Sequence, residues 1–159
     1  MGTRHHRLPR ECYRGRVSAA FTLCLMERRP FFTEPSLVGV FVDFLKEGAE
    51  KHLFVAIYCF MPDHAHLVCI GRNDNTDLLR GVEHFKQASG YWLAKQHPNT
   101  KWQKSFHDRV IRTPELGTKV RYVLNNPVRR GLVTDWRQYP FTAAVGVDLE
   151  AFLEELPPD

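Results

Sequence analysis

Two apolar segments joined by a three-residue turn place the strongest limit on how this chain can fold. Residues 53–60 (LFVAIYCF) and 64–70 (HAHLVCI) are almost continuously apolar, and Met61-Pro62-Asp63 separates them. Short apolar runs that are rich in β-branched and aromatic residues and bounded by turn residues predict strands. The short turn predicts an antiparallel hairpin. Because both faces of these strands are apolar, we expect the hairpin in the middle of a sheet that is covered on both sides.

Weaker patterns predict the other elements. These are a strand over 16–25, a helix from an N-cap at Ser36 to about 51, a helix over 78–96 capped by Thr76 or Asp77, a strand over 105–112, a helix over 114–125 that ends before Pro127, and a short helix over 148–156. The order strand, helix, strand, strand, helix, strand, helix is typical of an α+β domain. We therefore expect a ferredoxin-like antiparallel sheet with helices packed on it.

The chain has the length of a single domain, and we treat residues 1–159 as one unit with an irregular basic arm (1–15) and an acidic C-terminal tail (144–159). No apolar run approaches the roughly 20 residues that cross a bilayer, and the N-terminus lacks the apolar core of a signal peptide. We expect a cytoplasmic protein that does not enter a membrane. The four cysteines form no CxxC pair, so they are expected to be reduced and structural.

Positive charge is concentrated in two segments. Residues 1–30 hold seven arginines and two glutamates, and residues 101–140 hold nine Lys and Arg against three acids. If the fold brings these segments together, they could form one phosphate-binding surface. A generally solvated basic surface explains the charge equally well.

The second strand of the hairpin begins with His64-Ala65-His66. Because side chains alternate along a strand, both imidazoles lie on one face and Ala65 points to the other. Two imidazoles on one face can bind a single divalent cation, whereas two unpartnered buried histidines would be costly. The competing interpretation is a pair of histidines with ordinary hydrogen-bond partners.

The predicted helix before Pro127 carries a tyrosine and an asparagine. Tyr122 and Asn126 are four residues apart, so both would project from one face of that helix. The competing interpretation is a half-buried aromatic residue and a helix C-cap. Together with the histidine pair, however, an amide oxygen makes a three-ligand site with open positions, which suits Mg²⁺ or Mn²⁺. Such a site could polarise a phosphate for attack by the tyrosine hydroxyl.

These segments resemble single-tyrosine transposases of the HUH type, and in particular the REP-associated, IS200-like branch. The matching blocks, in order, are Met61-Pro62-Asp63-His64-Ala65-His66-Leu67, Phe106-His107-Asp108-Arg109-Val110-Ile111-Arg112, Tyr122-Val123 with Asn126-Pro127-Val128, Gly131-Leu132-Val133, and Tyr139-Pro140. The resemblance covers residues 16–143. A histidine pair alone is a weak motif, but the ordered set is specific.

The resemblance implies a role for several residues. His64, His66 and Asn126 would bind the metal, with Asn126 at a position where relatives have Gln, Asn or His. Tyr122 would attack single-stranded DNA and leave a 5′-phosphotyrosine and a free 3′-OH. Relatives act on hairpin-forming strands, and the basic residues we expect to contact the DNA backbone are Arg14, Arg16, Lys86, Arg109 and Arg112.

Other functions remain compatible with the sequence. The first is a domesticated relative that binds hairpin DNA without cutting it. The second is a replication-initiation or relaxase nuclease, although such proteins usually carry more domains or a second tyrosine. The third is a metal-binding protein unrelated to DNA. A monomer and a homodimer with shared active sites both fit the sequence.

Overall fold

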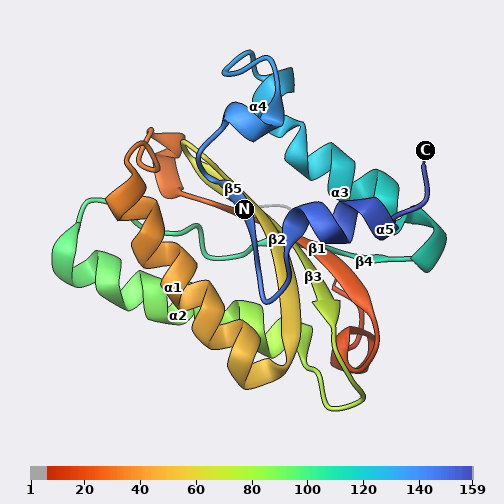
Figure 1. Cartoon of the computed structure of the whole chain (residues 1–159). Coiled ribbons are helices and arrows are strands. Elements are labelled where there is room, and N and C mark those ends of the chain that lie inside the picture. Colours follow the sequence, from red (N-terminus) through yellow and green to blue (C-terminus); the bar gives the residue numbers. More distant parts are fainter. Residues whose placement is uncertain (1–6, 159) are drawn as a thin grey trace.

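The computed structural model describes residues 7–158 and shows a five-stranded sheet with helices on both faces (Figure 1). The strands are β1 (Ser18–Cys24), β2 (Phe54–Met61), β3 (His64–Gly71), β4 (His107–Ile111) and β5 (Thr142–Val145). The α-helices are α1 (Pro35–His52), α2 (Leu78–Gln96), α3 (Leu116–Leu124), α4 (Asn126–Arg129) and α5 (Leu149–Glu155). One-turn 3₁₀ helices span Arg10–Tyr13, Met26–Arg28, Thr113–Glu115 and Trp136–Gln138.

The strand order is β4-β1-β3-β2-β5, and every neighbouring pair is antiparallel. The first six elements run β1-α1-β2-β3-α2-β4, which is the ferredoxin-like arrangement predicted from the sequence. The α+β prediction is therefore confirmed, and the apolar hairpin β2–β3 lies inside the sheet as expected. The sequence analysis missed β5, which extends the sheet beyond β2.

Helices α1 and α2 cover one face of the sheet and bury an aromatic cluster against it. Phe32 contacts Phe41 and Phe60 with ring centroids 4.9 and 5.1 Å apart, and Phe85 lies 5.9 Å from Trp102. The rings meet edge to face or tilted, which are favourable geometries for aromatic pairs. The indole N–H of Trp102 donates to the Ser89 hydroxyl at 2.9 Å, so its polar atom is satisfied inside the core.

Helices α3 and α4 lie on the opposite face, where α3 packs against β2 and β3 (Figure 1). Strand alternation decides which side chains meet each layer. Ala65 and Leu67 of β3 are completely buried and share the face of Phe60, toward α1 and α2. His64 and His66 therefore face the side of α3 and α4.

Two local predictions were wrong: the N-cap of the first helix, and the placement of Tyr122 and Asn126 on one continuous helix. Helix α1 begins at Pro35 after Glu34, not after an N-cap at Ser36, because proline is well suited to the first helical position. Helix α3 ends at its C-cap Asn125, and Asn126 starts α4 with Pro127 in its first turn. Asn126 is therefore not a helix C-cap.

The basic arm was also predicted incorrectly where the structure describes it. Residues 7–15 contain a one-turn helix whose Tyr13 is completely buried, and the Tyr13 hydroxyl donates to Asp108. Burial and this hydrogen bond raise the pKa of Tyr13 to about 12. The segment is anchored to the domain by this buried contact. Residues 1–6 lie outside the described part of the chain. At the other end, the predicted acidic tail contains the end of β5 and α5.

The four cysteines are free thiols, as predicted. Cys24, Cys59 and Cys69 are buried, and burial raises the pKa of Cys59 to about 11. A buried thiol with a raised pKa is a poor nucleophile, so these residues act as small apolar side chains.

The two longest helices are amphipathic. Helices α1 and α2 have 18 and 19 residues and carry charged side chains along their outer faces. Within residues 7–158, no helix combines the length and the apolar character needed to span a bilayer.

The crossing of α1 and α2 depends on two glycines, and this generates a stability prediction. A Cβ at Gly81 would lie 2.1 Å from Cε2 of the buried Phe54 ring, and a Cβ at Gly48 would lie 2.7 Å from the Gly81 carbonyl oxygen. Gly81→Ala should lower the free energy of unfolding by about 2 kcal/mol, because overpacking outweighs the gain in helix propensity. The matched control is Gly39→Ala on α1, where a Cβ meets nothing within 4 Å. It should stabilise the protein by about 0.5–1 kcal/mol. Urea denaturation measures both, and equal effects would contradict the packing argument.

Candidate active site

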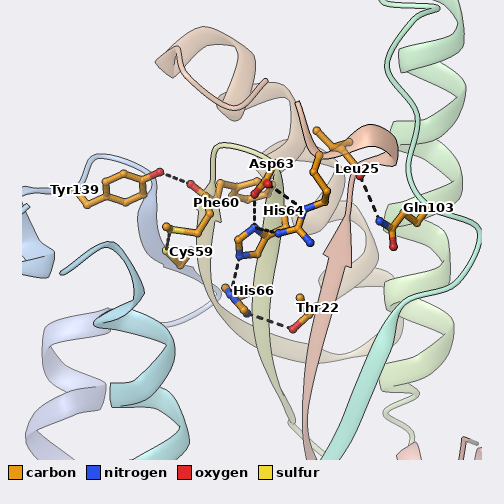
Figure 2. Close-up of polar contacts among 11 residues, drawn as sticks. Thr22, Leu25, Cys59, Phe60, Asp63, His64, His66, Gln103 and Tyr139 are labelled. Carbon is orange, nitrogen blue, oxygen red and sulfur yellow. Dashed lines mark hydrogen bonds and ion pairs between the residues drawn. The ribbon is translucent and has the colours of Figure 1, made fainter. Parts of the chain in front are cut away.

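The histidine pair lies at the end of the sheet where β3 begins. His64 pairs with Cys24 and Met61, and His66 pairs with Thr22 and Cys59. Both imidazoles project to the face of α3 and α4, and their Nε2 atoms are 3.0 Å apart (Figure 2). The two ring nitrogens thus converge on one point, as the strand pattern predicted.

Asp63, in the turn before β3, fixes the proton position on His64. The Nδ1 atom of His64 lies 2.6 Å from Oδ1 of Asp63, and Arg28 donates from Nε to Oδ2 at 2.9 Å. Burial opposes ionisation of Asp63, but the hydrogen bonds from Arg28 and His64 outweigh it and lower the pKa of the carboxyl. The ionised carboxylate accepts the Nδ1–H of His64. The Nε2 lone pair of neutral His64 is therefore free to accept a hydrogen bond or bind a cation.

Arg28 reaches Asp63 from a strained segment. Glu27 and Arg28 have φ angles of 66° and 53°, in the left-handed region that non-glycine residues rarely adopt. Strain of this kind persists only where the surrounding contacts hold it, and it is concentrated at functional sites. Here the Arg28–Asp63 ion pair is such a contact, and it links the strained segment to His64.

Thr22 on β1 provides a matching partner for His66. The hydroxyl oxygen of Thr22 lies 3.2 Å from Nδ1 of His66 (Figure 2). A hydroxyl can donate or accept, so it satisfies either neutral tautomer of the imidazole. Because His64 keeps its proton on Nδ1, His66 donates from Nε2 across the 3.0 Å contact. If His66 instead offers its Nε2 lone pair to a cation, its proton lies on Nδ1, and this N–H can donate to the Thr22 hydroxyl oxygen.

Both imidazoles are held in the neutral form. Burial, followed by repulsion between protonated His66 and the charges of His64, Lys119, Arg129 and Arg130, lowers the pKa of His66 to about 3. Burial also lowers the pKa of His64, and this effect outweighs the attraction of Asp63. Neutral imidazoles are the form that binds metal ions.

The spacing of the histidines fits two ligands of one cation. Two nitrogens that meet a cation at right angles, each about 2.0–2.1 Å from it, are roughly 3 Å apart, which matches the observed 3.0 Å. Among residues 7–158 no cluster of three or more His, Cys, Asp and Glu side chains has metal-binding geometry. A further protein ligand would therefore have to be a different group, such as an amide.

Asn126 is the residue that the sequence suggests as this amide. It is the first residue of α4 and is buried, with 7% of its surface exposed, where α4 packs against β2. The same helix is followed by Arg130, which lines a small cleft of about 240 Å³ together with Asp63 and His64. Asn126 thus lies on the histidine side of the sheet. Its role as a ligand stays a prediction.

Tyr122, near the C-terminal end of α3, is 54% exposed. The guanidinium carbon of Arg129 lies 3.6 Å from the centroid of its ring, and the ammonium of Lys119 lies 5.2 Å from it. The ring borders a cleft of about 410 Å³ between β4 and α3, whose lining includes Arg109 and Lys119. An accessible phenol therefore stands among cations on the same side of the sheet as the histidines.

The structure separates the basic residues that the sequence suggested for DNA contact. Arg109 lines the Tyr122 cleft, and Arg112 is exposed just before α3. Arg14 and Arg16 lie at the opposite end of the sheet from the histidines, near Asp77 and Asp74. These five assignments, including Lys86, stay predictions.

Lys86 belongs to a different surface. It lies on α2, across the sheet from the histidines, in a groove of about 720 Å³ that also includes Lys101 and Lys104. Its ammonium donates to the Lys104 carbonyl at 3.1 Å, and burial lowers its pKa.

Several residues of the site could not be found from the sequence. Thr22 becomes visible only through the β1–β3 register, and Arg28 only through the strained turn at the end of β1. Asp63 carried one signal, since it directly precedes His64 in a turn. Arg129 carried none, because its stacking on Tyr122 depends on the break between α3 and α4.

Comparison with known proteins identifies the family. The family described as "Transposase IS200 like" matches residues 15–126, which include the histidine pair, Tyr122 and Asn126. The chain belongs to this IS200-like transposase family.

Individual relatives agree with this assignment. A Haemophilus influenzae protein assigned as a REP-associated tyrosine transposase is 25% identical over an alignment of 138 residues, and the match covers 77% of each chain. The solved structure of a REP-associated tyrosine transposase bound to a REP hairpin superposes with a TM-score of 0.66 at 21% identity, over 89% of this chain and 82% of that one. A Deinococcus radiodurans protein assigned as a transposase gives a TM-score of 0.51 at 15% identity, over 79% of this chain and 97% of that one. The two structural matches support the fold.

The electrostatics of this IS200-like site generate a pH prediction. The His66 imidazole should stay neutral down to about pH 4, because its pKa is lowered to about 3. In the unfolded chain a histidine titrates near pH 6.5, so the unfolded state binds more protons below that pH. The stability supplied by neutral His66 is therefore present above about pH 6.5 and is lost as the pH falls toward 3.

NMR titration of the imidazole resonances measures this pKa directly. Lys119→Gln should raise the pKa of His66 because it removes a nearby positive charge, whereas Lys46→Gln on α1 should leave it unchanged. Titration of His66 near pH 6.5 in the wild-type protein would refute the burial argument.

Proposed function

We propose that this chain is a metal-dependent nuclease and strand transferase that cuts single-stranded DNA through a covalent tyrosine intermediate. The observation that carries the proposal is the convergence of two neutral imidazoles, 3.0 Å apart at Nε2, on the face of the sheet that also bears an exposed tyrosine flanked by cations. Neutral nitrogen ligands and an accessible phenol are the two components that this chemistry requires. Membership in a transposase family agrees with it.

His64, His66 and Asn126 would hold the divalent cation, Mg²⁺ or Mn²⁺. When bound, such a cation neutralises charge on the phosphate oxygens and helps position the phosphate. The protein contributes the orientation of its ligands. Asp63 keeps the His64 proton on Nδ1, and the Thr22 hydroxyl oxygen can accept a hydrogen bond from Nδ1–H of His66. Partners of this kind fix the ring orientation and raise the basicity of the ligand nitrogen.

Tyr122 is the proposed nucleophile. Its oxygen forms a bond to phosphorus while the bond from phosphorus to the 3′-oxygen breaks, so the DNA fragment on the 3′ side of the cut stays attached through its 5′-phosphate as a phosphotyrosine. The phenol proton passes to solvent, and the departing 3′-oxygen takes up a proton to become a free hydroxyl. The phosphodiester energy is conserved in the phosphotyrosine, so attack by a 3′-hydroxyl can rejoin strands without ATP.

The proposed substrate is single-stranded DNA that contains a hairpin. The structural relative named above was solved with a REP hairpin, which suggests the same class of partner for this chain. Arg109, which lines the Tyr122 cleft, and Arg112 would contact the backbone near Tyr122, while Arg14, Arg16 and Lys86 would contact DNA away from the cut.

A covalent adduct is the direct test of this mechanism. The purified protein, incubated with a library of labelled hairpin oligonucleotides and Mn²⁺, should give an adduct that survives denaturing electrophoresis. Tyr122→Phe should abolish the adduct and change hairpin affinity less than about threefold, because only the nucleophilic oxygen is lost.

Tyr91→Phe is the matched control for this experiment. Tyr91 is also exposed on a helix and has a cation, Lys95, over its ring at 5.1 Å. It should form the adduct at the wild-type rate. If the wild-type protein binds hairpins tightly but gives no adduct, the chain is a hairpin-binding protein without cleavage activity.

The role of Thr22 gives a separate test of the metal site. Thr22→Val removes the hydroxyl that accepts from Nδ1 of His66, so Mn²⁺ affinity should fall by about 10-fold to 100-fold. Titration of bound Mn²⁺ by electron paramagnetic resonance measures this affinity. Thr142→Val is the control, because Thr142 lies in the same cross-strand row but bonds to Cys59. Equal affinities in both variants would argue against His66 as a ligand.

A further inference from the structure

The cations around Tyr122 are arranged on its ring in an unusual way. The guanidinium carbon of Arg129 lies 3.6 Å from the ring centroid, closer than the other cations that stand over aromatic rings in this protein. Lys119, one turn before Tyr122 on α3, places its ammonium 5.2 Å from the same centroid. A planar guanidinium at this distance stacks on the ring and limits its rotation.

The break between α3 and α4 makes this contact possible. Arg129 follows Tyr122 by seven residues, which in an uninterrupted helix would separate them by about 10.5 Å along the axis. Asn125 leaves helical geometry with φ −84° and ψ 3°, and α4 starts in a new direction at Asn126. The change of direction brings the Arg129 side chain over the Tyr122 ring.

Arg129 differs in its partners from three arginines that are paired with acids. Arg10, Arg28 and Arg137 each form a close ion pair with a carboxylate. Over residues 7–158, no carboxylate is paired with Arg129, and the side chain is exposed. Its N–H donors are therefore available to an anion that approaches Tyr122.

The same cations stand on the face of the sheet that carries the histidine pair. Lys119 belongs to α3 and Arg129 to α4, and both helices pack on that face (Figure 1). The nearest carboxylate in the Tyr122 cleft is Glu115, which lies 3.9 Å from Arg109. No carboxylate of residues 7–158 forms an ion pair with Lys119 or Arg129, so an anion beside the Tyr122 oxygen would meet two unpaired cations.

We propose that Arg129 and Lys119 form the binding site for the phosphodiester that Tyr122 attacks, with Arg129 donating two N–H groups to its non-bridging oxygens. This inference rests on the proposed function and adds to it the residues that hold the reacting group. Attack by the tyrosine oxygen adds negative charge to the phosphoryl oxygens before the 3′-oxygen departs. A guanidinium fixed against the nucleophile stabilises that charge without having to move.

The test compares three variants in single-turnover cleavage of a labelled hairpin substrate. Arg129→Gln should slow formation of the tyrosine adduct by about 100-fold or more, with hairpin affinity changed by less than about threefold. Arg129→Lys should recover no more than about a tenth of the wild-type rate, because lysine keeps the charge but loses the planar pair of donors. The charge-matched control is Arg80→Gln on α2, which should cleave at the wild-type rate.

A modified substrate distinguishes phosphate binding from a structural role. A methylphosphonate at the cleavage position lacks one anionic oxygen, so Arg129 has much less charge to stabilise. On this substrate the penalty of Arg129→Gln should shrink at least tenfold relative to the normal phosphodiester. An equal penalty on both substrates would mean that Arg129 only supports the fold of the site, and the inference would be wrong.

The remaining outcomes separate this inference from the proposed function. If the wild-type protein cleaves and Arg129→Gln cleaves equally fast, the phosphate site is wrong and the tyrosine mechanism stands. If the wild-type protein forms no adduct with any hairpin, the phosphate site and the tyrosine mechanism are both wrong. The stacking itself is checked by NMR, since the Arg129 side-chain protons should shift downfield in Tyr122→Leu when the ring current is lost. Unchanged resonances would refute the stacked geometry.

Discussion

The register of the three inner strands determines the site. Thr22, His66 and Cys59 form one cross-strand row on β1, β3 and β2. A slip of one residue in β3 would turn Ala65 toward α3 and both imidazoles into the aromatic core under α1 and α2. Burying two unpartnered imidazoles and removing Leu67 from the core would both destabilise the folded state. The apolar packing of the hairpin therefore fixes the position of its polar residues.

The lowered pKa values of His64 and His66 follow from their buried position. Once the imidazoles are buried, desolvation opposes their protonation more strongly than the neighbouring Asp63 favours it, and the pKa of His64 is lowered. The cations of α3 and α4 act in the same direction on the pKa of His66. The site thus combines neutral ligands inside the domain with positive charge outside it. A cation can be held by the former, while a phosphate is attracted by the latter.

The sequence predicts the parts of the molecule that depend on local periodicity. The bounds of α2 agree with the prediction at both ends, and the shared face of His64 and His66 follows from alternation alone. Strand β5 could not be predicted, because a four-residue edge strand with two alanines has no distinctive pattern. The packing of Tyr13 was missed for a similar reason, since one buried residue in a basic segment leaves no repeat. The charge of a segment does not show on which face of the sheet its residues lie. Lys86 and Arg109 were therefore grouped together, although they lie on opposite faces.

The break at Asn125 has a mechanical consequence that a continuous helix would not have. From the sequence, Tyr122 and Asn126 were expected one turn apart on a single helix, so that both would move together. In the structure they belong to separate helices, with Asn126 buried and Tyr122 more than half exposed. A buried amide is held by the surrounding core, whereas an exposed phenol can adjust to a bound strand. The cation over its ring then limits that adjustment, because Arg129 is attached to the same short helix as the buried Asn126.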